Sequence, residues 1–130
     1  MTGKIESFRD LDAYQEACKL DEAIFWESRN WPAEEKFALI DQVRRSSRSV
    51  GANLAEAWAK RRYPAHFVSK LTDADGELQE ASHWLGRARH YKYLKAEKAD
   101  ELEAYCRRVG RIIAGLMAKP ESFVPRNPTA

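Results

Sequence analysis

The segment FVSKLTDADGELQEASHWLGRA, residues 67–88, places apolar side chains alternately four and three residues apart. This seam consists of Phe67, Leu71, Ala74, Leu78, Ala81, Leu85 and Ala88. A heptad pattern sustained over three heptads is typical of a long helix whose apolar stripe packs against other helices. The segment therefore predicts a helix that begins near Pro64 and forms one wall of a helical bundle.

Three further segments have helical apolar spacing. We expect helices over residues 10–29, over residues 32–62, and in a fourth segment that follows a break near YKYLKAEK, residues 91–98. The expected core positions are Leu11, Tyr14, Ala17, Leu20 and Ile24; Ile40, Val43, Ser47, Val50, Leu54 and Ala57; and Leu102, Tyr105, Val109, Ile112 and Leu116. Four long helices with short links predict an all-α fold, an antiparallel up-down-up-down four-helix bundle.

The bundle is expected to span residues 10–118. Residues 1–9 are predicted to be a flexible N-terminus, and residues 119–130, which contain three prolines, a disordered tail. No apolar run approaches the ~20 residues that span a bilayer, and the first residues show no secretion signal. The two cysteines, Cys18 and Cys106, are too few for a disulfide framework. We therefore expect a cytoplasmic protein with buried, reduced thiols and no membrane partner.

No catalytic motif is found in the sequence. Glu80 and His83 form one Glu-x-x-His, whereas di-iron bundles need this motif on two helices and inward glutamates on the other two. Helical spacing also turns these two residues away from the seam of residues 67–88. The serines at 46, 47 and 49 have no histidine nearby in the sequence that could act as a base. We therefore expect no enzyme activity, no metal and no cofactor.

The segment QVRRSSRSVGANLAEAWAKRR, residues 42–62, is strongly basic. It holds six Lys or Arg and one carboxylate, Glu56, whereas the rest of the chain holds sixteen basic and nineteen acidic residues. In an antiparallel bundle the second and fourth helices end on the same side, which predicts a basic cap suited to phosphates. The predicted phosphate contacts are Arg44, Arg45, Arg48, Lys60, Arg61, Arg62, Arg107, Arg108 and Arg111.

A second explanation for this charge pattern stays open. Predicted helices in this chain have carboxylates in their first turns and cations in their last turns, as the helix macrodipole favours. The macrodipole does not explain Arg44, Arg45 and Arg48, which lie in the middle of a helix. These three are expected to contact either phosphates or another subunit.

Small residues recur every four positions at Ser47, Gly51 and Ala55, on the flank of a core face. Such a ridge lets another helix approach closely. The chain also has four tryptophans, a high count for a small bundle. Together with aromatic residues on helix shoulders, the ridge predicts contacts between subunits of a homo-oligomer. The predicted interface residues are Ser47, Gly51, Ala55, Trp58, Trp84 and Tyr91.

Three stretches resemble the small bacterial four-helix-bundle proteins encoded within 23S ribosomal RNA intervening sequences. They are FRDLDAYQEACKL, WPAEEKFALIDQVRRSSRSVGANLAEAWAKR and the segment quoted first, and the resemblance covers residues 8–116. Its most specific part is the series Gln42, Arg44, Ser49, Asn53, Ala55 and Glu56, preceded by Pro32 and Glu35. The sequence departs from the family pattern at Ala57, where a glycine is usual, and at Glu77, where a serine is usual.

The resemblance implies a closed homopentameric ring of bundles. The family is also similar to accessory proteins of diversity-generating retroelements, which are basic pentameric barrels that bind nucleic acid and a reverse transcriptase. The leading hypothesis is a non-catalytic, ring-forming accessory protein that binds RNA or DNA without base specificity. The alternative is a protein-interaction scaffold without nucleic-acid binding. In that scaffold the arginines would pair across subunits with Glu56 or with Asp73, Glu77 and Glu80.

Overall fold

A computed structural model of the chain describes residues 4–126, and every regular element in that range is helical. The four long helices are α1 (Asp12–Ser28), α2 (Leu39–Ala59), α3 (Pro64–His90) and α4 (Ala96–Ala118). Three short 3-10 helices accompany them: η1 (Phe8–Asp10), η2 (Ala33–Glu35) and η3 (Pro120–Phe123). The predicted all-α fold with four helices is confirmed.

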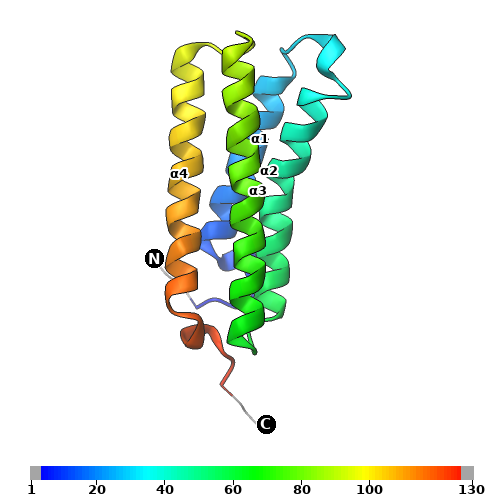
Figure 1. Ribbon diagram of the computed structural model, residues 1–130. Coiled ribbons are helices and arrows are strands. Elements are labelled where there is room, and N and C mark those ends of the chain that lie inside the picture. The colour runs from blue at the N-terminus through cyan, green and yellow to red at the C-terminus, as the bar shows by residue number, and fades with distance from the viewer. Residues whose placement is uncertain (1–3, 127–130) are drawn as a thin grey trace.

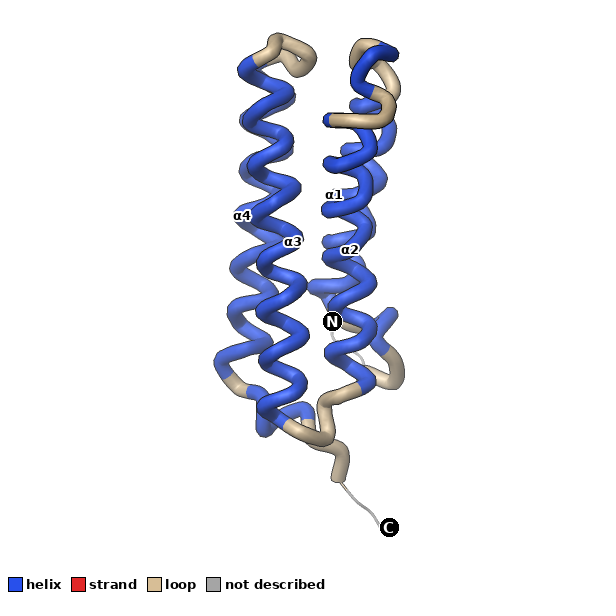
Figure 2. The backbone as a smooth tube through the Cα atoms, turned by 45° about the vertical axis from the view of Figure 1, so that its right-hand side comes forward, coloured by secondary structure: helices blue, strands red, loops and turns tan. Residues whose placement is uncertain are grey.

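The four helices lie around one hydrophobic core, and consecutive helices run in opposite directions (Figure 1). α2 packs most extensively against α3, and α1 contacts both α2 and α4. In Figure 2, α1 and α2 form one side of the molecule and α3 and α4 the other. α2 and α4 therefore occupy diagonal corners, as do α1 and α3.

The buried face of α3 is the seam that the heptad pattern predicts. Its seven positions are the complete set of buried residues in this helix: Phe67, Leu71, Ala74, Leu78, Ala81, Leu85 and Ala88. Pro64 occupies the first turn, where a backbone N–H would have no partner within the helix. Full burial of one Leu or Phe side chain contributes about 1.5–3 kcal/mol. The seam is therefore a main source of the bundle's stability.

The predicted core faces of the first two helices are also found. All six predicted positions of α2 are buried: Ile40, Val43, Ser47, Val50, Leu54 and Ala57. Leu11, which precedes α1, is buried, as are Ala17, Leu20 and Ile24 within it, whereas Tyr14 is half-buried.

The seam of α4 is rotated from the predicted one. Leu102 and Val109 are buried as predicted, but the other buried positions of this helix are Ala99, Cys106 and Ile113. Tyr105, Ile112 and Leu116 are half-buried on the flank. Tyr105 lies there because its hydroxyl donates a hydrogen bond to Glu16 of α1 at 3.1 Å, which keeps the polar end of the ring at the boundary between the two helices.

The prediction of one helix over residues 32–62 is wrong, because the chain breaks between η2 and α2. Ala38 adopts φ −125° and ψ −102°, which no helix accommodates. The Glu35 carboxylate accepts hydrogen bonds from the Leu39 N–H at 3.4 Å and from the Tyr93 hydroxyl at 2.8 Å. The bond to Glu35, together with burial, raises the pKa of Tyr93 to about 12. Glu35 thus fixes the turn against the loop between α3 and α4.

The N-terminal end of the chain is folded from Ser7 onward. The Ser7 hydroxyl accepts a hydrogen bond from the Arg9 N–H, and the Asp10 carboxylate accepts one from the Ser7 N–H, both at 3.1 Å. This reciprocal arrangement is a capping box that begins η1. The predicted flexible segment of residues 1–9 therefore does not extend to Ser7. Residues 1–3 lie outside the described residues.

The prediction of a disordered tail from residue 119 is wrong for Pro120–Phe123. This segment forms η3 at the lower end of the bundle in Figure 1. The ring of Phe123 packs against Phe67 of α3, with 5.4 Å between ring centroids, and against Trp58 of α2 at 6.3 Å. The tail therefore closes this end of the core. Residues 127–130 of the predicted tail lie outside the described range.

The small-residue ridge of α2 packs against α1 of the same chain. Ser47 and Gly51 are buried, and a Cβ at Gly51 would meet Tyr14 Cε1 at 3.5 Å and Cys18 Sγ at 3.8 Å. Ala55 and Cys18 are half-buried. The prediction that Ser47 and Gly51 contact another subunit is therefore corrected, because the close approach that they permit joins two helices of one chain.

Gly51→Leu is expected to destabilise the protein by about 1–3 kcal/mol, because the outer atoms of leucine would overlap Tyr14 and Cys18. The matched control is Gly76→Leu, inside α3, where a Cβ meets nothing within 4 Å. Both changes remove a helical glycine, so their difference reports packing and not helix propensity. Urea unfolding measures that difference. Equal midpoints for the two variants would contradict the close packing of α1 on α2.

Phe123→Ala is expected to lower the free energy of unfolding by about 1–2 kcal/mol, less than the loss of a fully buried ring, because Phe123 is half-buried. Glu121→Ala, at an exposed position of η3, is the control and should be neutral. Thermal unfolding followed by circular dichroism compares the two. If Phe123→Ala were as stable as the control, η3 would not be packed on the bundle in solution.

Candidate functional site

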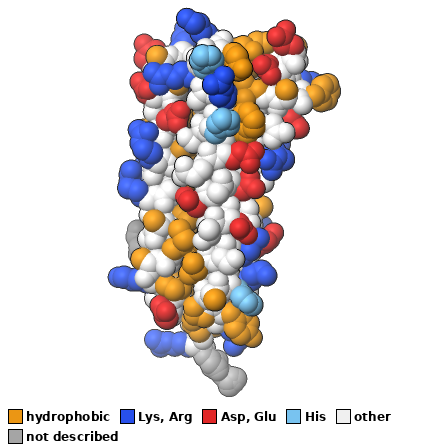
Figure 3. Space-filling model, in the orientation of Figure 1, with side chains coloured by type: hydrophobic (Ala, Val, Ile, Leu, Met, Phe, Trp, Pro, Cys, Tyr) orange, Lys and Arg blue, Asp and Glu red, His pale blue; other side chains and the backbone are white. Residues whose placement is uncertain are grey.

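The nine basic residues predicted to contact phosphates fall in three separate places. Arg44, Arg45 and Arg48 lie along α2, Lys60, Arg61 and Arg62 follow its end, and Arg107, Arg108 and Arg111 lie along α4. α2 and α4 are diagonal, and Arg107 lies about 16 Å along its helix from the last residue of α4. Figure 3 shows Lys and Arg side chains spread around the edges of one face. The predicted single basic cap is therefore not formed within the described chain.

The cations after α2 lie at the end of that helix. The Arg61 guanidinium lies 4.1 Å from the centre of the Trp58 ring and donates a hydrogen bond to the Trp58 carbonyl at 3.0 Å. A cation on the last carbonyls of a helix is what the macrodipole favours, so that explanation suffices for Arg61. Lys60 and Arg62 are exposed, and no carboxylate of residues 4–126 lies within 4 Å of either.

On α4, Arg108 helps to join that helix to α1. Its Nη2 lies 3.7 Å from Oε1 of Glu16, which also accepts the hydrogen bond from Tyr105. Burial acts to raise the pKa of Glu16, but hydrogen bonds, first that of Tyr105, hold it below its ordinary value. Arg107 and Arg111 lie on the other flank and line a groove of about 400 Å³ between α3 and α4.

Arg45 is paired with carboxylates of α3. Its guanidinium lies 2.6 Å from Glu80 Oε2 and 3.7 Å from Glu77 Oε1. Trp84 Nε1 donates to the same Glu80 oxygen at 3.0 Å. The hydrogen bond from Trp84 and the charge of Arg45 hold the pKa of Glu80 below its ordinary value, against the opposite effect of burial. Arg45 and Trp84 therefore stabilise contacts within this chain.

Glu80 and His83 belong to this network. The Glu80 carboxylate already accepts hydrogen bonds from Arg45 and Trp84, and the exposed His83 ring lies 4.8 Å from the Trp84 ring. Over residues 4–126, no group of three or more His, Cys, Asp or Glu side chains is placed to hold a metal ion.

Arg44 faces α1 and has a different environment. Its Nε donates a hydrogen bond to the hydroxyl of the buried Ser28 at 2.9 Å, and its guanidinium lies 4.8 Å from the centre of the Phe25 ring. Burial lowers the pKa of Arg44, and the charges of Arg48 and Arg29 lower it further. A half-buried guanidinium is thus held beside two like charges.

Arg48 approaches the same aromatic ring, with its guanidinium 5.8 Å from the centre of Phe25. Its charge acts to lower the pKa of Asp21 on α1, but burial is the larger effect and raises that pKa. In the described chain, no carboxylate lies within 4 Å of Arg44 or Arg48. We call these two residues the arginine pair. Like charges at short range cost free energy, and an anion bound between them would remove that cost.

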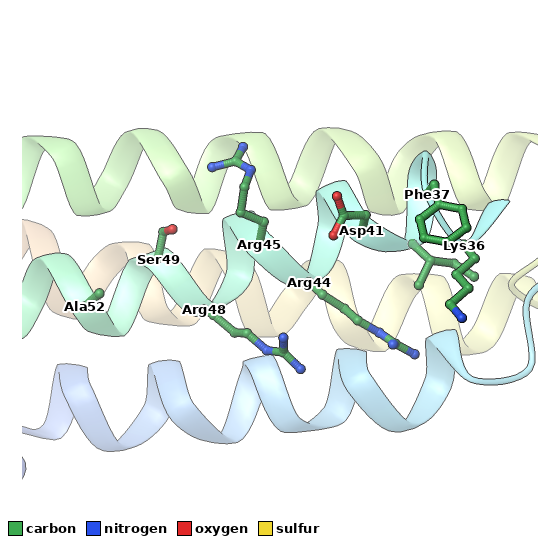
Figure 4. Close-up of a pocket in the computed structure, with 9 residues that line it drawn as sticks. Lys36, Phe37, Asp41, Arg44, Arg45, Arg48, Ser49 and Ala52 are labelled. Carbon is green, nitrogen blue, oxygen red and sulfur yellow. The ribbon is translucent and has the colours of Figure 1, made fainter.

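The arginine pair lines an open groove on the outward side of α2, which we call the α2 groove (Figure 4). Its volume is about 550 Å³, and its lining includes Lys36, Phe37 and Asp41. In Figure 4 the arginine pair points toward α1, whereas Arg45 and Asp41 point toward α3. The side of the groove next to α1 is therefore the cationic side.

Phe37 is the candidate site residue that sequence reasoning missed. It is 86% exposed, the most exposed large hydrophobic side chain among the described residues. Its ring lies beside Lys36, whose Nζ is 5.3 Å from the ring centre. In the sequence, Phe37 falls inside the predicted helix of residues 32–62 and close to two core residues, so no local signal separates it from the core. Only the break before α2 turns it toward solvent.

The family model of the 23S rRNA-intervening sequence protein matches residues 9–115. The chain belongs to this family. A crystal structure of a protein of unknown function from the S23 ribosomal protein family, from Bacteroides thetaiotaomicron, is similar to it, with a TM-score of 0.73. The two are 22% identical over 82% of this chain and 95% of that chain, so the likeness shows the fold alone. A search of curated proteins found no match.

Tyr91 and Trp84 line a third cavity in this member of the 23S rRNA-intervening sequence protein family. The cavity has a volume of about 360 Å³ and lies between the start of α2 and the end of α3. Tyr91 is exposed, with the Arg87 guanidinium 5.2 Å from its ring centre, and Trp84 is half-buried. A subunit contact at these two residues stays a prediction. No helix in the described part of the chain is long and apolar enough to cross a membrane.

Inorganic phosphate should raise the melting temperature of the wild-type protein above its value in chloride at the same ionic strength. An anion that binds only the folded state stabilises that state by about 1.4 kcal/mol when the free anion concentration is ten times the dissociation constant. The double variant Arg44→Gln, Arg48→Gln should lose this increment. The control, Arg89→Gln with Lys98→Gln, removes two cations that already have carboxylate partners and should keep it. Equal increments in all three proteins would show that phosphate does not act at the arginine pair.

Proposed function

We propose that this protein is a non-catalytic nucleic-acid-binding accessory protein whose α2 groove contacts the phosphates of RNA or DNA. The proposal rests on the arginine pair, two neighbouring guanidinium groups with no carboxylate partner in the described chain. The planar guanidinium group can donate two hydrogen bonds to one phosphate. Arg44 uses only its Nε within the described chain, which leaves its terminal nitrogens for a ligand.

The other predicted phosphate contacts differ in how available they are. Arg45, Arg61 and Arg108 already contact carboxylates or a carbonyl of the same chain. We therefore expect them to contribute little to phosphate binding. Four predicted contacts beyond the groove are exposed and have no carboxylate partner among residues 4–126: Lys60, Arg62, Arg107 and Arg111. We assign these a secondary role as phosphate contacts far from the groove, which would add affinity without base specificity.

We also propose that the up-down-up-down bundles assemble into a ring-like homo-oligomer, with five copies as the family resemblance implies. Exposed aromatic side chains support an assembly, because Tyr, Trp and Phe are enriched at interfaces between subunits. The two that we assign to subunit contacts are Trp26 and Tyr91. A ring would repeat the α2 groove around its circumference and multiply the phosphate contacts. A reverse transcriptase as partner and a cytoplasmic location stay predictions.

The exposed aromatic residues also favour the alternative, a protein-interaction scaffold without nucleic-acid binding. The contacts of the acidic residues count against it, because the carboxylates suggested as partners of arginines in other subunits are engaged in this chain. Lys70 lies 2.7 Å from Glu56 and 3.4 Å from Asp73. Arg45 forms ion pairs with both Glu77 and Glu80. In this scaffold the arginine pair would therefore need other acidic groups, from a second subunit or from a partner protein.

Filter binding of RNA and duplex DNA at several salt concentrations tests the proposal. The wild-type affinity should fall steeply with salt, because each phosphate contact contributes a slope of about −0.9 to log affinity against log salt for duplex DNA, and about −0.7 for single strands. Arg44→Gln with Arg48→Gln should weaken binding and make the slope of log affinity against log salt shallower, by up to the contribution of two phosphate contacts. The control, Arg89→Gln with Lys98→Gln, should bind like the wild type. Circular dichroism confirms that the variants are folded.

Weak retention that is equal in all three proteins and independent of salt would contradict nucleic-acid binding and leave the scaffold as the better function. Loss of binding in the control variant as well would show that net charge, and not the arginine pair, determines retention.

A further inference from the structure

The α2 groove combines two features that serve different parts of a nucleotide. The arginine pair lies along one side, and Phe37 lies at the end of the groove nearest the start of α2 (Figure 4). We propose that the groove selects single-stranded nucleic acid, with the phosphates on the arginine pair and an unpaired base stacked on Phe37. This inference rests on the proposed nucleic-acid binding and names its substrate class.

The exposure of Phe37 is imposed by its surroundings. The Glu35 carboxylate accepts hydrogen bonds from the Leu39 N–H and the Tyr93 hydroxyl, and the Ala38 N–H donates to the Glu35 carbonyl at 3.1 Å. These bonds hold the turn that carries Phe37, so the ring is presented to solvent from a fixed backbone. A fixed aromatic ring can accept a base with little loss of conformational freedom.

The spacing along α2 suits an extended chain. Arg44 and Arg48 are one helical turn apart, about 6 Å along the axis, and the part of the groove between Ile40 and Ala52 extends about 18 Å. Phe37 precedes this part of the groove. A single strand could therefore run along α2 with its backbone on the arginine side and one base turned back onto Phe37.

An exposed aromatic ring distinguishes single strands from duplexes. In a duplex the bases are stacked on one another, whereas a single strand offers free faces to aromatic side chains. Every base has such a face, so stacking does not select a sequence. Asp41 also lines the groove, but it points toward α3, away from the arginine pair, and leaves the opposite side for the backbone (Figure 4).

The test compares a labelled single-stranded oligonucleotide with the duplex of the same sequence, using fluorescence anisotropy at one salt concentration. Removal of one stacking aromatic lowers single-strand affinity roughly tenfold. We therefore expect Phe37→Ala to bind the single strand about tenfold more weakly than the wild type and to bind the duplex with unchanged affinity. Phe37→Trp should keep the wild-type affinity for both. The matched control is Tyr63→Ala, which removes an exposed aromatic beside the cations at the other end of α2 and should leave binding unchanged.

The outcomes separate the two proposals. Binding that depends on the arginine pair but is equal for single strand and duplex, or is unchanged in Phe37→Ala, overturns this inference and leaves the proposed function in place. No binding of either nucleic acid overturns the proposed function itself. Light scattering decides a third case. If Phe37→Ala lowers the mass of the assembly, Phe37 is a contact between subunits, and the inference is wrong.

Discussion

α3 buries seven side chains at alternating spacings of four and three residues, and α2 and α4 both pack against it. This burial fixes the rotation of α3 about its own axis. The rotation in turn decides which carboxylates of α3 face α2, namely Glu77 and Glu80, and these neutralise Arg45. Arg44, one position earlier in the chain, is turned about 100° from Arg45 around α2 and faces α1 instead. The core of the bundle thus determines which arginine is paired.

α1 offers Arg44 and Arg48 a phenyl ring, and offers Arg44 a hydroxyl as well, but no carboxylate within 4 Å. Exposed ion pairs contribute little to stability, so an unpaired cation at the surface costs the fold little. A half-buried cation beside like charges costs more, since burial already disfavours its charged form. The folded chain alone therefore does not neutralise the charge of Arg44. This distinguishes it from Arg61, which donates a hydrogen bond to the Trp58 carbonyl, and from Arg108, which lies near the Glu16 carboxylate.

The parts of the fold that the sequence predicts are those governed by contacts repeated along one helix. The α3 seam and the α2 face follow from periodicity alone, and both are found as predicted. The break before α2 could not be predicted, because Glu35 is held by Tyr93, which is 58 residues away in the sequence. The burial of Phe123 likewise depends on Trp58 and Phe67, far from it in the chain. Arg44, Arg45 and Arg48 lie within α2 as predicted, but Arg107 and Arg108 lie in the middle of α4 and not at its end. The position of these arginines and the diagonal placement of α2 and α4 could not be predicted from the local sequence.

The contact between Glu35 and Tyr93 links the stability of one end of the bundle to the shape of the α2 groove. Trp31 is buried beside it, with its ring centroid 6.3 Å from that of Tyr93, so the turn before α2 is anchored in the core as well as by hydrogen bonds. The same anchoring prevents residues 36–38 from continuing the helix and leaves Phe37 outside. The arginine pair is on a rigid helix and Phe37 on an anchored turn, so the groove exists before any ligand arrives. A preformed site loses less conformational entropy on binding than a loop that must be ordered. A flexible partner bound there, as proposed, would lose conformational entropy of its own, whereas the groove would lose little.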